Sequence, residues 1–216
     1  MYYTPGIDMS VDDVSDSVHF FILLDTSASM SGQPIQQLND GMFDLLNEIC
    51  YYAEKREVNP LMHILSFGSE IRWLYGTTAT HGVSASQIAW HDLPTVSGTN
   101  TSAALEAVLE GLSIQHLGHH SYPPIIVLIS DGRSDDPPGT LSAIRELESH
   151  PLTTIRVAVG PKGCNTEELE AFATMGTVCF EDVLGNLSDT RYTKLLFPIE
   201  RTAVLAELIS TLAITS

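Results

Sequence analysis

The sequence predicts an α/β fold in which a doubly wound, mostly parallel central sheet carries helices on both faces and one short antiparallel strand at its edge. The first observation is that short apolar runs alternate along the chain with longer segments whose apolar residues recur every three to four positions. This alternation indicates strands that alternate with helices, as in a parallel sheet. The second observation is that the connections are short, and short right-handed crossovers place helices on both faces.

The first half of the chain contains three predicted strands and one predicted helix. Residues 18–24 form a nearly continuous apolar run, VHFFILL, which is typical of a strand covered on both faces. Apolar residues at three-to-four spacing predict a helix with one buried stripe over residues 34–55. Residues 61–67 are the next predicted strand, and residues 71–75 are predicted to pair beside it as the antiparallel edge. Residues 76–98 contain many turn residues, and the pattern predicts no element there.

The second half of the chain continues the same alternation. A helix is predicted through residues 103–112, and the apolar run at 125–130, which follows two prolines, is predicted to be another buried strand. The remaining predicted elements are helices at 141–149, 166–174 and 200–212 and strands at 153–159 and 178–180.

The domain organisation is predicted from length and from the composition of the N-terminus. Residues 1–16 are predicted to be a flexible acidic arm, because they carry four aspartates and few large apolar side chains. Residues 17–216 are predicted to form a single domain. A chain of 216 residues is long enough to bury one core, and nothing in its length requires a second domain.

Charge and composition exclude several partners and compartments. The chain has 27 acidic and 10 basic residues and no basic stripe that could bind a phosphate backbone, so we expect no nucleic acid partner. Cys50, Cys164 and Cys179 lack C-x-x-C spacing, and neither a disulfide framework nor a thiolate zinc site is predicted. The N-terminus lacks the pattern of a secretion signal, and no apolar run approaches the roughly 20 residues that span a bilayer. We therefore expect a cytoplasmic protein without membrane contact.

Oxygen-bearing side chains follow two of the predicted strands and precede one predicted helix. Asp25, Ser27 and Ser29 come directly after the first strand, Asp131 comes directly after the later buried strand, and the segment Ser97-Gly98-Thr99-Asn100-Thr101 leads into a helix. Because the carboxyl ends of parallel strands meet at one edge of a sheet, we expect these three loops to lie together. Oxygen donors without nitrogen or sulfur suit a small hard cation. We predict Mg²⁺, with Mn²⁺ or Ca²⁺ as alternatives.

The composition of this predicted site also indicates what it binds besides the ion. With only two carboxylates around it, a divalent ion keeps residual positive charge and can take one more anionic oxygen. We therefore expect an Asp or Glu side chain of a partner protein to complete the shell. This function needs no catalytic base, and we expect an interaction module rather than an enzyme.

Several residues near the site have a second interpretation. An Asp-x-Ser sequence after a strand can also cap the next helix by accepting backbone N–H groups, without any metal. Asp135 and Asp136 either attract the cation and basic partner surfaces, or are solvated charges at the start of a helix ahead of Pro137.

The motifs D-T-S-A-S at 25–29, G-T at 98–99 and I-S-D-G at 129–132 resemble the metal-ion-dependent adhesion site of von Willebrand A domains. The resemblance covers about residues 18–213 and implies a Rossmann-like sheet. It also implies the role of each site residue. Direct contact with the ion is implied for the two serines, direct or water-mediated contact for the threonine, and mostly water-mediated contact for the two aspartates.

A narrower resemblance lies within that superfamily. The sequence D-T-S-A-S-M-S-G-Q-P-I and the later L-S-F-G at 65–68 are most similar to the bacterial tellurium-resistance group called TerY. This resemblance implies a bacterial tellurium-resistance or stress-response system, with a serine/threonine kinase or phosphatase as partner. Many relatives read G-G-T where this chain reads S-G-T-N-T-S, which is why Thr101 stays an alternative ligand.

Two other functions are compared with the interaction module. One is a scaffold whose metal site is vestigial and whose contacts lie elsewhere, for example on Trp90 or the last predicted helix. The other is a magnesium-dependent phosphohydrolase, which needs a nucleophilic Asp and usually a second acid two residues later. Position 27 is a serine, and the chain has no phosphate loop, nucleophile elbow or H-E-x-x-H motif. The residues therefore favour the interaction module.

Overall fold

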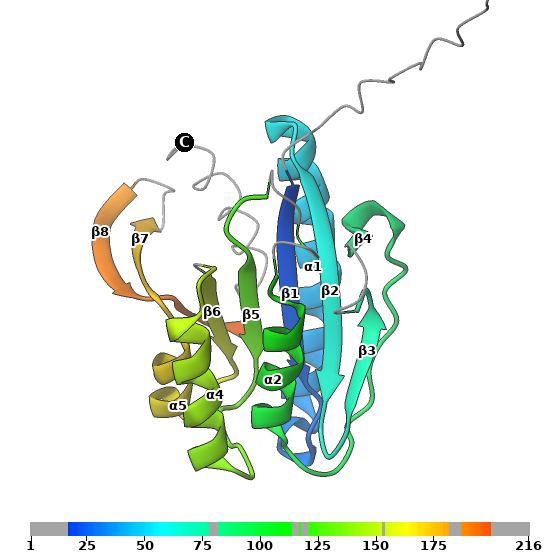
Figure 1. The fold of residues 1–216 in the computed structure, drawn as a ribbon, viewed down its shortest axis with the longest axis vertical. Coiled ribbons are helices and arrows are strands. Elements are labelled where there is room, and N and C mark those ends of the chain that lie inside the picture. Colours follow the sequence, from blue (N-terminus) through cyan, green and yellow to red (C-terminus); the bar gives the residue numbers. More distant parts are fainter. Residues whose placement is uncertain are drawn as a thin grey trace, which may run out of the picture.

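Five parallel strands form the centre of the main sheet in the structure, a computed structural model that describes residues 17–77, 82–113, 117, 121–152, 154–181 and 187–199. These strands are β1 (Ser17–Asp25), β2 (Asn59–Phe67), β5 (Ile125–Ile129), β6 (Ile155–Gly160) and β9 (Leu196–Pro198). Two antiparallel strands, β3 (Ile71–Tyr75) and β4 (Val83–Ser84), pair with β2. The order β3-β2-β1-β5-β6-β9 confirms the predicted parallel sheet and its short antiparallel edge (Figure 1).

Helices cover both faces of this sheet. α1 (Gln33–Arg56) lies on one face, and α2 (Thr101–Gly111), α4 (Pro137–Ser149) and α5 (Thr166–Phe172) lie on the other (Figure 1). Short 3-10 turns, η1 (Ala28–Met30) and η2 (Ala85–Gln87), follow β1 and β4. The doubly wound arrangement predicted from the alternation of strands and helices is therefore confirmed.

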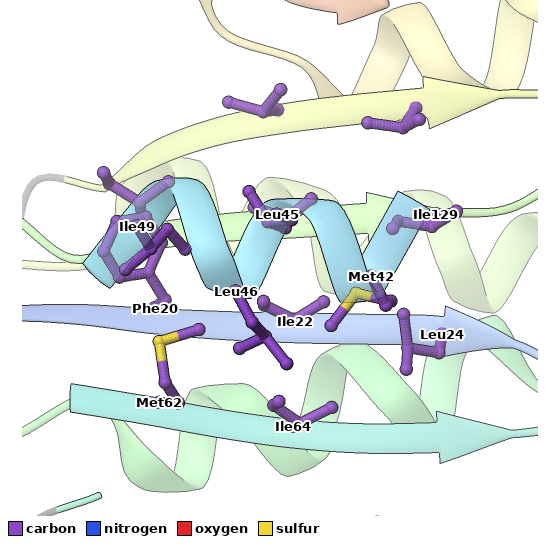
Figure 2. Packing of buried hydrophobic residues seen from close by; sticks show 14 of the residues in the cluster. Phe20, Ile22, Leu24, Met42, Leu45, Leu46, Ile49, Met62, Ile64 and Ile129 are labelled. Carbon is purple, nitrogen blue, oxygen red and sulfur yellow. The ribbon is translucent and has the colours of Figure 1, made fainter. Parts of the chain in front are cut away.

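Side chains along β1 alternate between two hydrophobic clusters, one on each face of the sheet. Phe20, Ile22 and Leu24 pack against the buried stripe of α1 (Figure 2). Phe21 and Leu23 belong to the cluster beneath α2, α4 and α5. Because helices cover both faces, every side chain of the predicted apolar run is buried. This explains why apolar and polar residues do not alternate along the strand.

The position of β1 in the sheet creates a switch point. β1 lies between β2 and β5, so the chain winds away from it in opposite directions on its two sides. Leu24 of β1 pairs with Ile129 of β5, and the residues that follow these two leave the sheet at the same edge. Loops beyond such a switch point commonly form binding sites in open α/β sheets.

Parts of the chain differ from the predicted elements. α4 begins at Pro137 rather than at the predicted residue 141, because Asp136 caps it by accepting a hydrogen bond from Gly139 N at 3.1 Å. β4 and η2 lie within 76–98, where the sequence pattern predicts no element. These short elements contain too few residues to produce a recognisable periodicity.

The C-terminal part contains strands that the sequence pattern does not predict. β7 (Met175–Glu181) is longer than the predicted strand at 178–180 and pairs with β8 (Leu187–Lys194) in a separate antiparallel sheet. β8 reads LSDTRYTK and lacks an apolar run, and β9 is only three residues long. The predicted arm at 1–16 and the predicted helix at 200–212 lie outside the described residues. In the part of the chain that the structure describes, no helix is long and apolar enough to cross a membrane.

Candidate metal centre

Asp25 is the last residue of β1, and its side chain is fully buried at the switch point. Its Oδ1 accepts a hydrogen bond from Ser27 N at 2.8 Å, and its Oδ2 accepts one from Ser130 Oγ at 2.6 Å. Burial raises the pKa of Asp25, the hydrogen bonds from Ser130 and Ser27 oppose this effect, and the nearby charge of Asp131 raises the pKa further. A cation beside this carboxylate would therefore stabilise its ionised form.

Ser27 and Ser29 place two hydroxyl groups next to this carboxylate. Their Oγ atoms lie 2.9 Å apart within hydrogen-bond distance, with Ser27 buried and Ser29 exposed. Ser27 occupies the N-cap position of η1, but its side chain makes no capping hydrogen bond. The capping interpretation is therefore wrong for Ser27, whereas Asp25 does accept a backbone N–H inside this turn.

Asp131 enters the site from the loop after β5. Its side chain is buried, its Oδ1 accepts a hydrogen bond from Arg133 N at 3.2 Å, and its Oδ2 has no hydrogen-bond partner among the described residues. The guanidinium of Arg133 lies 3.6 Å from that Oδ2. Gly132 between them has φ of 71°, and a Cβ there would come within 2.5 Å of Asn165 O, so this position requires glycine.

Thr99 lies on the third loop and is tied to the Asp131 loop through Asp135. Thr99 N donates a hydrogen bond to Asp135 Oδ2 at 2.6 Å, and Asp135 N donates one to Thr99 O at 3.0 Å. Asp136, by contrast, caps α4 as the helix-start interpretation predicts. Asp135 therefore connects two loops. Thr99 and Asp135 are 36 residues apart in the sequence, so no local sequence pattern could predict their contact.

Thr101, the alternative to Thr99, is the first residue of α2 and is buried. Its Oγ1 has no hydrogen-bond partner among the described residues. Asn100 caps the same helix by accepting a hydrogen bond from Ala103 N at 3.2 Å. Both threonines therefore remain candidates for a ligand from this loop.

The chemistry of these residues fits a hard cation. Within the described ranges, no group of three or more His, Cys, Asp and Glu side chains is placed to hold a metal. A cation at this edge of the sheet would therefore depend on hydroxyl oxygens together with two carboxylates, a donor set that suits Mg²⁺ or Mn²⁺. The buried Oδ2 of Asp131 and Oγ1 of Thr101 both lack hydrogen-bond partners in this part of the chain. Buried polar atoms without partners are costly, and an ion with its waters would satisfy them.

The fold and these loops define a class of protein: a doubly wound α/β domain with a D-x-S-x-S loop at its switch point. Residues 20–191 match the von Willebrand factor type A domain, and the chain belongs to this family of metal-dependent interaction modules. This finding confirms the resemblance predicted from the motifs, at the level of the superfamily.

This chain shares low sequence identity with the proteins it resembles and spans only part of the length of several of them. Human von Willebrand factor A domain-containing protein 5B1 is 25% identical over 152 residues, which cover 68% of this chain but only 11% of that protein. Proximal thread matrix protein 1 from the mussel byssus has a TM-score of 0.58 at 15% identity, covering 92% of this chain and 48% of that one. At this identity the likeness shows the fold alone.

Two further similar structures contain a metal. One is proximal thread matrix protein 1 with zinc in its metal-ion-dependent adhesion site (MIDAS) motif. It has a TM-score of 0.53 at 12% identity, and the match covers 92% of this chain and 45% of that one. The other is manganese-loaded TRAP protein from Plasmodium vivax, with a TM-score of 0.56 and 17% identity over 89% of this chain and 72% of that one. These metals belong to those proteins.

Proposed function

We propose that this chain is a metal-dependent protein-protein interaction module whose cation is held by Asp25, Ser27, Ser29, Thr99 and Asp131. One observation carries the proposal: the buried carboxylate of Asp25 lies beside a pair of serine hydroxyls that are 2.9 Å apart. Asp131, on the loop after the neighbouring strand β5, supports it, because its buried Oδ2 accepts no hydrogen bond within the described residues. Thr99 is our choice over Thr101, because Thr99 is the threonine of the G-T motif and its own backbone is bonded to Asp135. The buried Oγ1 of Thr101, which has no hydrogen-bond partner among the described residues, keeps Thr101 as the alternative.

The proposed ion is Mg²⁺, with Mn²⁺ or Ca²⁺ as alternatives. The zinc and manganese named for two similar structures support a divalent metal without choosing among these ions. When bound, the ion supplies a positive centre that takes up a carboxylate oxygen. The chain's own residues hold the ion and leave it exposed at the edge of the sheet, where Ser29 is exposed. The proposed partner is therefore a protein that presents an Asp or Glu side chain.

The proposed cellular setting rests on the motif resemblance alone. The sequence D-T-S-A-S-M-S-G-Q-P-I favours the TerY group, a bacterial tellurium-resistance or stress-response system, and a kinase or phosphatase partner in the cytoplasm. We also propose that residues 17–216 form one domain, since the family match extends over 20–191. No nucleic acid or membrane partner is proposed.

A scaffold with a vestigial site is the second candidate, and one contact favours it. The guanidinium of Arg133 lies 3.6 Å from Asp131 Oδ2 and balances part of the charge that a cation would balance. An enzyme is not proposed. The serine at position 27 stands where a phosphohydrolase of this type would usually have its second acid.

The proposed function is tested by affinity capture of partners from a lysate, in the presence of Mg²⁺ and in the presence of a chelator. Wild type should capture proteins only with Mg²⁺, and Ser27→Ala should capture none of them. Ser86→Ala is the matched control, because Ser86 also shares a hydroxyl hydrogen bond, with Ser84 at 3.1 Å, but is exposed and lies on η2. Capture of the same proteins under all conditions would favour the scaffold.

A further inference from the structure

A third acidic residue, Glu168, lies next to the proposed metal centre, on a helix that the site motifs do not include. It belongs to α5, whose start packs against the Asp131 loop. Asn165 N donates a hydrogen bond to Asp131 O at 2.7 Å. A Cβ on Gly132 would lie 2.5 Å from Asn165 O and 3.1 Å from Leu169 Cγ, so loop and helix are in direct contact.

The carboxylate of Glu168 is directed toward the same loop. Its Oε2 accepts a hydrogen bond from Ser134 N at 3.4 Å, and its Oε1 is buried without a hydrogen-bond partner among the described residues. Burial raises the pKa of Glu168, and the charges of Asp131 and Asp25 raise it further. Ser134 lies on the loop that carries Asp131, so this hydrogen bond places the Glu168 carboxylate beside the proposed site.

The three carboxylates leave an imbalance of charge at this edge of the sheet. Asp25, Asp131 and Glu168 all come from buried or half-buried positions, where like charges repel strongly. Among the described residues, Arg133 forms an ion pair with Asp131 of this group. The Arg133 side chain is 60% exposed, so solvent screens its charge. A divalent ion held by the loops of Asp25 and Asp131 would offset this repulsion more than Arg133 does.

We propose that Glu168 is a further acidic residue of the cation site, where its charge strengthens the binding of a hard divalent ion. This inference rests on the proposed function of that site. Glu168 acts through its charge. Glu168 is not one of the ligands, and its negative charge beside the Asp131 loop raises the affinity of the site for the metal in the absence of any partner.

The test uses the full chain and Mn²⁺ alone as the probe, with binding measured by titration calorimetry. Glu168→Gln should bind Mn²⁺ about tenfold more weakly than wild type, as expected for the loss of one nearby charge facing a divalent ion. Glu167→Gln is the matched control, because Glu167 lies in the same first turn of α5 but is exposed. Its affinity should stay within about twofold of wild type, since its charge is screened by solvent.

Thermal melting in excess chelator supplies a second readout. If Glu168 only supports the fold through Ser134, Glu168→Gln should melt at a lower temperature and keep its Mn²⁺ affinity. We expect instead that it melts at the same or a higher temperature, since a repelled charge is removed, while the affinity falls. Equal Mn²⁺ affinity of Glu168→Gln and Glu167→Gln would overturn this inference alone. Absence of Mn²⁺ binding by wild type would overturn the proposed function as well.

Discussion

Thr99 and Asp135 are joined by two reciprocal hydrogen bonds. The backbone N–H of Thr99 donates to Asp135 Oδ2 at 2.6 Å, and the backbone N–H of Asp135 donates to Thr99 O at 3.0 Å. These bonds hold the loop before α2 against the loop after β5, so the threonine and Asp131 reach the same edge of the sheet. Asp135 is thus a positioning residue for the proposed metal centre.

Asp135→Ala should weaken Mn²⁺ binding about tenfold, because residues that orient the ligands of a metal typically contribute at least this much to affinity. Asp135→Asn should recover most of the loss, since its amide oxygen can still accept from Thr99 N. Asp136→Ala is the control. It removes the cap of α4 and should cost about 1 kcal/mol of stability without changing the Mn²⁺ affinity. Titration calorimetry and urea unfolding measure the two effects, and equal affinities for Asp135→Ala and Asp136→Ala would contradict this role.

Arg133→Ala should tighten Mn²⁺ binding about three- to tenfold. The guanidinium lies 3.6 Å from Asp131 Oδ2 and repels a cation that approaches the same carboxylate. The side chain is 60% exposed, so the ion pair itself should contribute less than about 1 kcal/mol to stability. Arg145→Ala, an exposed position on α4, should leave the affinity unchanged. Weaker Mn²⁺ binding by Arg133→Ala would show that the arginine supports the site instead of competing with the metal.

Ser130→Ala should destabilise the metal-free protein by about 1–3 kcal/mol, because a buried carboxylate loses a hydrogen bond. Ser130 Oγ donates to Asp25 Oδ2 at 2.6 Å and accepts from Gly132 N at 3.0 Å, so it links the ends of β1 and β5. Ser86→Ala, at an exposed hydroxyl pair, should change stability by less than about 0.5 kcal/mol. Urea unfolding of both variants in chelator measures the difference, and equal midpoints would refute the link.

The stability of the metal-free protein should respond to pH through Asp25. Its pKa in the folded protein is raised above the ordinary 3.8, chiefly by burial. The folded state then binds the proton more tightly than the unfolded state, so the contribution of Asp25 to stability falls as pH rises from below 3.8 through the folded pKa. The Asn side chain of Asp25→Asn stays neutral, so this variant does not lose stability through that residue as pH rises. The stability of Asp25→Asn relative to wild type, from urea unfolding in chelator, should therefore increase with pH, and a constant or decreasing difference would contradict the assigned shift.

The central elements of the fold could be predicted because their side chains carry a strong local pattern. β1 lies between two helix layers, so its apolar run is uninterrupted, and α1 covers one face, so its apolar residues recur along one stripe. The position of the site motifs followed from the same reasoning, since Asp25 ends β1 and Asp131 lies on the loop after β5, its parallel neighbour. That these residues hold a metal remains a prediction. The final predicted helix and the N-terminal arm remain predictions.

The parts that could not be predicted depend on contacts between distant segments. β8 has no apolar run, and its pairing with β7 fixes it as a strand. Ser130, Asp135 and Glu168 each acquire a role through a partner on another loop or element, such as Asp25 or Thr99. Composition and periodicity along one segment do not reveal such pairs.

The most direct test of the account is thermal melting of the wild type, Asp25→Ala and Asp44→Ala, each with a chelator and with saturating Mg²⁺ or Mn²⁺. Asp44 is an exposed aspartate on α1 and serves as the control for loss of one negative charge. At an ion concentration of about 100 times Kd, binding contributes about 2.7 kcal/mol, which should raise the Tm of wild type and Asp44→Ala by roughly 5–10 °C. Asp25→Ala should show no shift. A wild-type melting curve that is unchanged by either ion would contradict the proposed metal centre.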